Sequence, residues 1–202
     1  MDNQEQGLAA IQDIKRIMER SSRFISLSGW SGIAAGVCAL AGAWTATHFI
    51  TEYKTGTLKI NFLESTLLLV AASTFVAAFI SAFVFTYIRS RREGIAVWGN
   101  SAQRLMFNTA IPLMAGAFVV YRMLELGDYG LIAPSCLIFY GLALVNGSKY
   151  TLGEVKFLGY FQIALGIINL WMPGYGLFLW ALGFGLLHII YGLVMWWKYE
   201  RQ

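Results

Sequence analysis

Polar residues inside long apolar runs are the side chains that could do chemistry in this sequence, and His188 is the first of them. Residues 157–197 contain no Asp, Glu, Lys or Arg and are divided by the turn sequence Pro173-Gly174-Tyr175-Gly176. Counting from that turn at about 1.5 Å per residue, His188 lies about 18 Å along the second half, near the middle of a bilayer. Gln162, in the first half, is expected at nearly the same depth.

Three hypotheses for His188 follow from this position. A hydrogen bond between Gln162 and His188 that joins the two halves is the simplest, and Tyr191, one turn further along, is a second candidate partner. A buried histidine can also contact a ligand or transfer protons, and it can ligate haem. His188 and three intramembrane residues with amide side chains form a candidate ligand-binding set: His188, Gln162, Asn169 and Asn108.

Asn108 also has a structural explanation, because Pro112 follows it by one helical turn. A proline inside a helix displaces the carbonyl of the residue four positions earlier and removes one backbone hydrogen bond, so we expect a kink. Asn108 and Thr109 are placed to satisfy the groups that the proline frees. Repair of the kink is therefore the alternative to ligand binding for Asn108.

A second set of polar residues falls at the predicted outer ends of the apolar runs. Arg122 and Glu125 are i,i+3 neighbours, which favours an ion pair, and whether Glu64 also reaches Arg122 depends on how the helices pack. These residues form either ordinary surface salt bridges or the rim of an outward-facing pocket. The set consists of Arg122, Glu125, Glu64 and His48.

Patterns typical of enzymes and metal sites are absent from the sequence. It has no H-E-x-x-H pair, no phosphate-binding glycine loop and no G-x-S-x-G serine. His48 and His188 are too few for a multi-histidine iron site, and Cys38 and Cys136 lie inside apolar runs, which indicates neither a disulfide framework nor metal binding. We therefore expect a protein without catalytic residues, metal or cofactor.

The elements that must position these residues are transmembrane helices. The 202 residues are 57% hydrophobic and only 13% charged, whereas soluble domains are about a quarter charged. One crossing needs about 20 apolar residues, and the apolar runs predict an all-α bundle of six transmembrane helices. Their approximate bounds are 24–50, 62–88, 105–122, 131–148, 155–172 and 177–197.

Residues 1–23 are predicted to form an amphipathic helix before the first span, with Leu8, Ile11, Ile14 and Met18 on one face. Such a helix either lies on the membrane surface or docks a partner. With six crossings, twelve of the 15 Lys and Arg residues fall on the side of the termini, so the positive-inside bias predicts that both termini are cytoplasmic. The basic residues are not clustered on one solvated face, which argues against nucleic-acid binding.

Glycines at helical spacing in the first, fifth and sixth spans predict close helix packing. The motif Gly29-Trp30-x-x-Ile33-Ala34-x-Gly36 matches Gly159-Tyr160-x-x-Ile163-Ala164-x-Gly166 at a constant offset of 130 residues. The match is either a parallel internal repeat or a chance similarity between apolar helices. Thr151 and Glu154 predict a T-x-x-E capping box at the start of the fifth span.

Three stretches carry a resemblance to a group of known proteins: residues 22–29, residues 139–146, and residues 174–185 with 188–192. The chain resembles, over nearly its whole length, a family of uncharacterised bacterial integral membrane proteins typical of the Bacteroidetes. The resemblance implies a six-helix protein of the bacterial inner membrane. Some relatives carry a carotenoid-cleaving oxygenase label, but that enzyme class binds iron through four histidines, and with two histidines the activity is not carried over.

Two functions are compatible with these observations. The first is a non-enzymatic interaction protein or membrane-embedded sensor component, whose partners would be the lipid bilayer, a membrane or cytoplasmic protein, or a second copy in a homo-oligomer. The alternative is a small carrier or binding protein for an apolar or weakly polar ligand, with the candidate set around His188 lining a pocket at mid-depth.

Overall fold

The computed structural model describes residues 28–56, 59–94 and 98–201, and every regular element in these ranges is a helix. This confirms the predicted all-α class. The predicted amphipathic helix of residues 1–23 lies outside the described residues. The long helices are α2 (Gly29–Lys54), α3 (Ile60–Arg92), α4 (Asn100–Leu126), α5 (Ile132–Gly147) and α6 (Val155–Leu170).

The last crossing combines three consecutive segments, which we call the C-terminal helix: α7 (Gly176–Trp180), η3 (Ala181–Leu187) and α8 (His188–Tyr199). Its middle segment, η3, is π-helical, so its turns are wider than those of an α-helix. Two short 3-10 turns, η1 (Tyr129–Leu131) and η2 (Ser148–Tyr150), extend α5 at its two ends.

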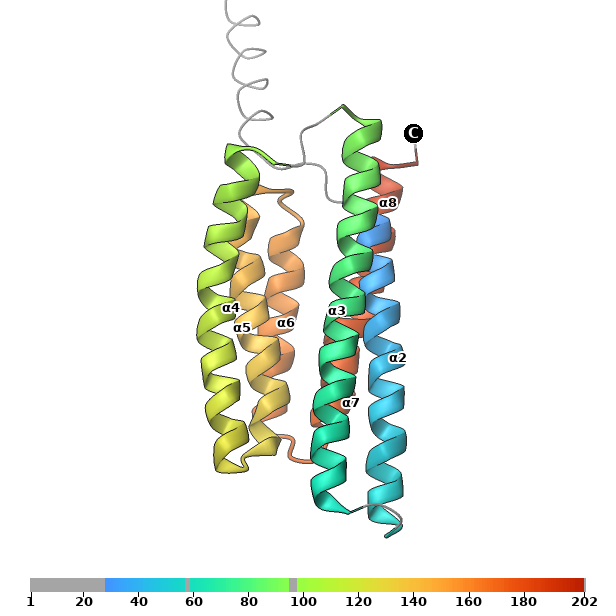
Figure 1. Ribbon diagram of the computed structural model, residues 1–202. Coiled ribbons are helices and arrows are strands. Elements are labelled where there is room, and N and C mark those ends of the chain that lie inside the picture. The colour runs from blue at the N-terminus through green and yellow to red at the C-terminus, as the bar shows by residue number, and fades with distance from the viewer. Residues whose placement is uncertain (1–27, 57–58, 95–97, 202) are drawn as a thin grey trace, which may run out of the picture.

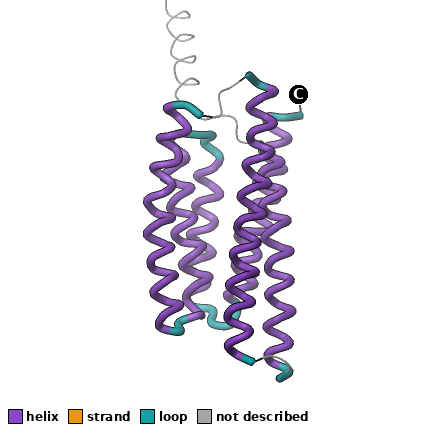
Figure 2. The backbone as a smooth tube through the Cα atoms, in the orientation of Figure 1, coloured by secondary structure: helices purple, strands orange, loops and turns teal. Residues whose placement is uncertain are grey.

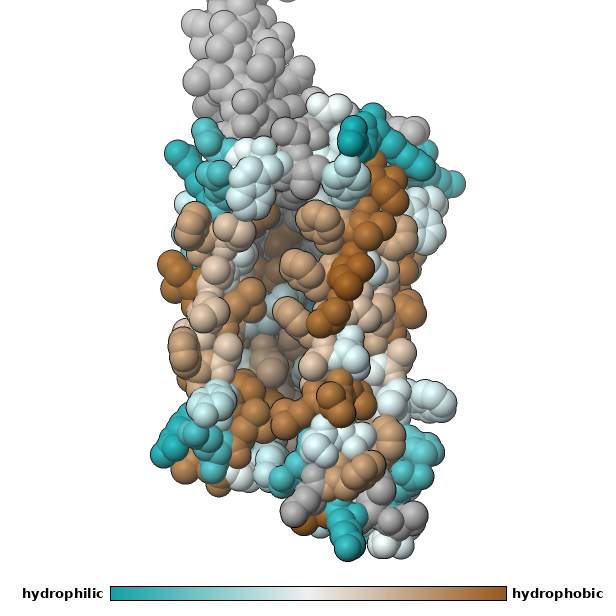
Figure 3. All heavy atoms as spheres, viewed as in Figure 1, coloured by the Kyte–Doolittle hydropathy of each residue, from teal (hydrophilic) through white to brown (hydrophobic). Residues whose placement is uncertain are grey.

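The helices have the length and hydrophobicity of membrane spans. Five stretches are long and apolar enough to cross a membrane, and hydrophobic side chains form a belt between hydrophilic ends (Figure 3). α6 is apolar but has only 16 residues, or about 24 Å, less than the hydrocarbon core of about 30 Å. The chain is therefore a helical bundle of the multi-pass membrane type. The five stretches are Gly29–Lys54, Phe62–Arg92, Asn100–Leu126, Tyr129–Tyr150 and Gly176–Tyr199.

The helices run along a common axis and form two groups that lie side by side (Figure 1, Figure 2). In the first group α2 packs against both α3 and the C-terminal helix, and in the second group α5 packs against both α4 and α6. Contacts of α5 and α6 with the C-terminal helix join the groups. α3 and α4 each pack mainly on one neighbour, so their remaining surfaces carry many exposed apolar side chains.

A glycine seam holds α2 against the C-terminal helix in the first group. A Cβ atom added to Gly29 would lie 2.5 Å from the carbonyl oxygen of Gly192, and one added to Gly192 would lie 2.5 Å from the carbonyl oxygen of Gly29. Further along the same pair, a Cβ atom on Gly36 would lie 2.6 Å from the carbonyl oxygen of Gly185. The two backbones are therefore in direct contact, the packing that small residues permit inside a membrane.

The second group contains the same kind of seam between α5 and α6. A Cβ atom added to Gly159 would lie 2.8 Å from the carbonyl oxygen of Gly141, and the reverse distance is 2.7 Å. At the next contact, a Cβ atom on Gly166 would meet Ile138, just as one on Gly36 would meet Ile189. The matching motifs of α2 and α6 therefore make matching contacts, and each group is built around one closely packed helix pair.

The predicted capping box at Thr151 and Glu154 is wrong. α6 begins at Val155, which makes Glu154 the N-cap residue, and its side chain forms no capping hydrogen bond. The Glu154 carboxylate instead accepts hydrogen bonds from Lys198 and Tyr199 at the end of the C-terminal helix. A distant ion pair outweighs the local cap because the two chain segments meet at the same end of the bundle.

Candidate functional site

Polar side chains join the two helix groups near the middle of the bundle. Gln162 of α6 is fully buried, and its Nε2 atom donates a hydrogen bond to the carbonyl oxygen of Gly183 at 2.8 Å. His188, at the start of α8, places its Nδ1 atom 3.0 Å from the same carbonyl. Position 183 accepts no larger residue without a shift, since a Cβ atom there would lie 2.6 Å from Oε1 of Gln162.

The hydrogen bond between Nδ1 of His188 and the Gly183 carbonyl determines the tautomer of His188. A carbonyl oxygen can only accept, so Nδ1 carries the proton and Nε2 is left as an acceptor. The hydroxyl of Tyr140 on α5 lies 2.8 Å from Nε2 and donates to it. Nε2 of Gln162 lies 3.4 Å from Nδ1 of His188, but both atoms are then donors, so the two side chains share the Gly183 carbonyl rather than bonding to each other.

This arrangement refines the predicted contact between Gln162 and His188. The two residues do lie at the same depth and do join α6 to the C-terminal helix, through a shared backbone acceptor. Both ring nitrogens of His188 have a partner, so haem ligation through Nε2 would require loss of the bond from Tyr140. The hydroxyl of Tyr191, which the sequence suggested as a partner of His188, makes no hydrogen bond in the described part of the chain.

Two buried polar atoms in this region have no hydrogen-bond partner among the described residues: Oε1 of Gln162 and the hydroxyl of Tyr191. An unsatisfied buried group costs about 1–3 kcal/mol. Native proteins keep few such groups, and each calls for an explanation such as a water molecule, a ligand or a functional role.

Aromatic rings continue from the polar contacts toward the start of the C-terminal helix. Trp180, Phe184 and His188 follow one another at four-residue spacing, with ring centroids 4.9 Å apart for the first pair and 5.9 Å for the second. Tyr140 lies beside them, 4.9 Å from Phe184 and 5.4 Å from His188. We call these four residues the aromatic column.

The other two members of the candidate ligand-binding set lie elsewhere. Asn169 is buried at the end of α6, where its Nδ2 atom lies 3.5 Å from the carbonyl oxygen of Gly176 across the turn into α7. Asn108 lies on α4 and donates to the carbonyl of Arg104 at 2.8 Å. The structure therefore brings His188 and Gln162 together and leaves the two asparagines apart from them.

Pro112 explains the polar contacts around Asn108. The carbonyl of Asn108 loses its helical donor because proline has no N–H, and it accepts a hydrogen bond from Nδ2 of Asn146 on α5 at 2.8 Å. Thr109 bonds back to the carbonyl of Leu105 at 2.9 Å. The freed backbone group is thus satisfied by a neighbouring helix, which supports the kink-repair explanation and adds Asn146 to it.

The residues of the predicted outer rim form separate pairs, one of which joins the two helix groups. Nη1 of Arg122 and Oε2 of Glu125 lie 3.1 Å apart, which confirms the expected ion pair. Glu64 accepts a hydrogen bond from the hydroxyl of Tyr129 at 2.6 Å. His48 pairs with Glu52 on its own helix, at 3.8 Å. The side chains shown here are surface pairs rather than one converging pocket.

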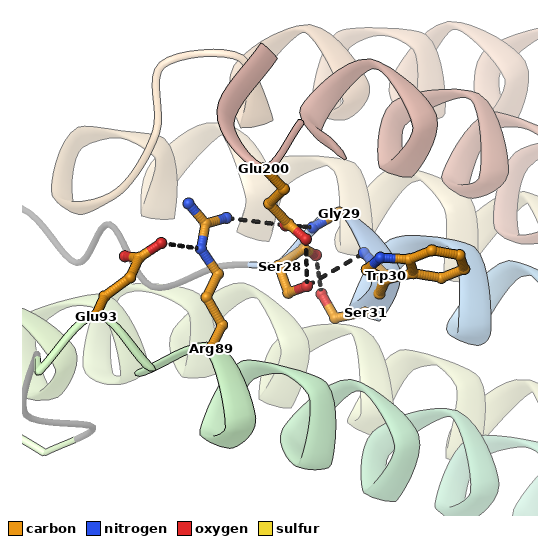
Figure 4. A network of polar contacts seen from close by, with 7 residues as sticks. All are labelled: Ser28, Gly29, Trp30, Ser31, Arg89, Glu93 and Glu200. Carbon is orange, nitrogen blue, oxygen red and sulfur yellow. Dashed lines mark hydrogen bonds and ion pairs between the residues drawn. The ribbon is translucent and has the colours of Figure 1, made fainter. Parts of the chain in front are cut away.

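A charged cluster at the opposite end of the bundle was not predicted from the sequence. The Glu200 carboxylate accepts hydrogen bonds from the backbone N–H of Gly29 at 2.5 Å and from Nη1 of Arg89 at 3.0 Å (Figure 4). Ser28 donates to its other oxygen at 3.3 Å. The arrangement suits a carboxylate, since the start of a helix presents free N–H groups and a positive dipole. We call Ser28, Gly29, Arg89 and Glu200 the terminal cluster.

The terminal cluster is mostly shielded from solvent, with side-chain exposures of 11% for Arg89 and 15% for Glu200. Beside it, the Glu154 carboxylate accepts hydrogen bonds from Lys198 and Tyr199. Partial burial alone would raise the pKa of Glu154, but the hydrogen bonds from Lys198 and Tyr199 outweigh it, so the net pKa lies below its ordinary value. The end of the C-terminal helix thus contacts both groups.

No family model, curated protein or solved structure matches this chain. Within residues 28–56, 59–94 and 98–201, no group of three or more His, Cys, Asp or Glu residues could hold a metal ion. The side chains described at the centre of the bundle form hydrogen bonds, through Tyr140, Gln162 and His188, and ring contacts, through Tyr140 and His188.

Proposed function

We propose that this chain is a six-span protein of the bacterial inner membrane that acts as a membrane-embedded sensor or interaction component and not as an enzyme. In this topology α6 is the short fifth span and both termini are cytoplasmic. The charge distribution supports the orientation: Arg89, Arg91 and Arg92 end α3 at the same end of the bundle as Lys198, as the positive-inside bias requires.

The observation that carries the proposal is the contrast between packing within and between the helix groups. Within each group, backbones touch along a glycine seam. Between the groups, the side chain of Leu137 packs on Gly183, and hydrogen bonds join the helices at Gln162, Tyr140, Glu154 and Glu64. Hydrogen bonds can be exchanged for others after a small shift, whereas a packed seam cannot. The groups are therefore suited to move as units against each other.

The C-terminal helix can carry such a movement along the bundle axis. His188 and Glu200 are both on this segment, about 18 Å apart along it. Glu200 contacts Ser28 and Gly29, which directly follow the N-terminal residues 1–27. A change at the centre of the bundle would thus reach the terminal cluster and the N-terminal arm that we expect to dock a partner.

Co-purification tests this proposal. The full-length protein, extracted from its native membrane in mild detergent, is expected to carry a protein partner that native mass spectrometry resolves, and deletion of residues 1–20 should remove it. The variant Arg122→Gln, which changes an exposed pair at the other end, should keep it. Recovery of the chain free of any other protein, from membranes that contain its natural partners, would contradict the proposal.

A carrier or binding protein for an apolar or weakly polar ligand is the second candidate, favoured by the two unpaired polar atoms between the groups. A carrier must open its site to both membrane faces in turn. In a Cys38→Ala/Cys136→Ala background, Tyr191→Cys should then react with a small membrane-impermeant thiol reagent from either side. Reaction from one side only, or from neither, would exclude transport and leave sensing.

A further inference from the structure

The surface between α3 and α4 is hollowed, and hydrophilic atoms show on its floor among hydrophobic ones (Figure 3). α3 packs mainly on α2, and α4 packs mainly on α5. Neither helix therefore covers the space between the two groups. Behind them lie α5 and the C-terminal helix, which carry the aromatic column. A molecule dissolved in the bilayer could thus approach the centre of the bundle from the side.

The aromatic column offers a flat, partly open surface. Trp180, Phe184 and Tyr140 are each half-buried, whereas His188 behind them is buried. Phe184 lies between the rings of Trp180 and His188, so one more ring can pack edge-to-face along the side of the column. Lipid chains are flexible and gain little from such a surface, so the column favours a ligand with a ring.

The Tyr191 hydroxyl supplies the polar contact for such a ligand. It lies one turn beyond His188 on the same segment, its oxygen is buried, and it has no partner among the described residues. A hydroxyl donor of this kind matches an oxygen substituent that accepts a hydrogen bond.

We propose that the aromatic column and the Tyr191 hydroxyl bind a membrane-soluble ring compound with carbonyl or hydroxyl oxygens, of the quinone and quinol class. The ring packs edge-to-face against Phe184 and Trp180, and the hydroxyl of Tyr191 donates to a ring oxygen. His188 and Tyr140 position the column through their mutual hydrogen bond. This inference rests on the proposed sensing role and names the molecule that is sensed.

Binding of menaquinone-4 to the full-length protein in detergent micelles tests the inference. We expect one menaquinone-4 per chain by native mass spectrometry and saturable quenching of tryptophan fluorescence. Phytol, which has an isoprenoid chain but no ring, should not compete. Tyr191→Phe should raise the Kd about tenfold, the effect of one net hydrogen bond, and Phe184→Leu should raise it by a similar factor.

Matched variants separate binding from folding. Tyr160→Phe on α6 and Phe178→Leu on α7 change exposed rings. Both variants should leave the Kd unchanged. Tyr191→Phe removes an unpaired hydroxyl, so its thermal midpoint without ligand should equal or exceed that of the wild type. No binding beyond empty micelles, or equal Kd values for Tyr191→Phe and Tyr160→Phe, would overturn the inference.

The outcome is independent of the co-purification test. A partner that is retained while menaquinone-4 fails to bind would remove the ligand and leave the interaction role. Binding of menaquinone-4 by a protein that co-purifies with no partner would support the ligand and remove the interaction role.

Discussion

The glycine seams inside the helix groups and the polar contacts between the groups are opposite solutions to packing in a membrane. In a seam, Gly29 and Gly192 or Gly141 and Gly159 bring backbone against backbone, and stability comes from close van der Waals contact. Between the groups, Gln162 and His188 share one carbonyl oxygen, and Glu154 binds the end of the C-terminal helix. A glycine seam allows only one geometry. The hydrogen bonds between the groups can form again after the groups shift relative to each other.

The largest expected effect comes from enlarging a seam glycine. Gly192→Ala puts a methyl group 2.5 Å from the backbone oxygen of Gly29, so the helices must separate, at a cost of about 3 kcal/mol or more. Gly141→Ala should cost a similar amount, because its surroundings are equivalent. Thermal unfolding in detergent measures both, with Gly130→Ala, which has open space around it, as control. Tolerance of one seam variant and loss of the other would break the equivalence of the groups.

The terminal cluster should give the next largest effect. Glu200→Gln removes the carboxylate charge that joins Arg89 to the N–H of Gly29, while Glu93 stays paired with Arg89 at 2.7 Å. The loss of one charged partner of such a cluster should cost about 1–3 kcal/mol at this partial exposure. Arg122→Gln disturbs an ion pair with side chains 65% and 43% exposed, so it should cost less than about 1 kcal/mol. The thermal midpoints of the two variants give the comparison, and equal midpoints would show that Glu200 is no structural anchor.

The contacts at the centre of the bundle should matter less for stability than the seams. Tyr140→Phe removes the donor to Nε2 of His188 and should cost about 1 kcal/mol. His188→Gln keeps a side chain that can hydrogen-bond and should still yield folded protein. Size-exclusion chromatography and thermal unfolding check both variants. A complete loss of folded Tyr140→Phe protein would mean that the polar interface is as indispensable as a seam.

The smallest effect is the pH dependence contributed by Glu154. Its folded pKa is lowered, so its stabilising contribution is present above the ordinary carboxyl pKa of about 4.3 and disappears as pH falls through the folded pKa. Wild type should therefore exceed Glu154→Gln in thermal midpoint at pH 7, with a difference that closes on acidification below about pH 4. A difference that stays constant down to pH 3 would exclude this ionic contribution.

Local pattern was enough to predict the helices, the Arg122–Glu125 pair and the common depth of Gln162 and His188. Apolar run length defines a span, and one turn of the chain defines an i,i+3 pair. The motifs shared by α2 and α6 were visible in the sequence, but the contacts that make them equivalent depend on Gly141 and Gly192, which no simple offset connects to them.

Residues that act on distant segments could not be predicted in this way. Tyr140, Asn146 and Glu200 each satisfy a group on another helix, and sequence spacing carries no information about which helices become neighbours. Asn146 had one available signal, because Pro112 predicts a freed carbonyl that some donor must satisfy. Tyr140 and Glu200 had no comparable signal in the sequence.

One additional residue in the π-helical segment η3 determines how both His188 and Glu200 are oriented around the axis of the C-terminal helix. A π-type turn contains about one residue more than an α-type turn, and each residue of an α-helix advances the chain by about 100° around its axis. Conversion of residues 181–187 to a regular α-helix with no residue removed would rotate everything beyond them by about that angle. His188 would turn away from Tyr140, and Glu200 from Gly29, in one step. The inserted residue thus acts as the phase-setting element of the bundle.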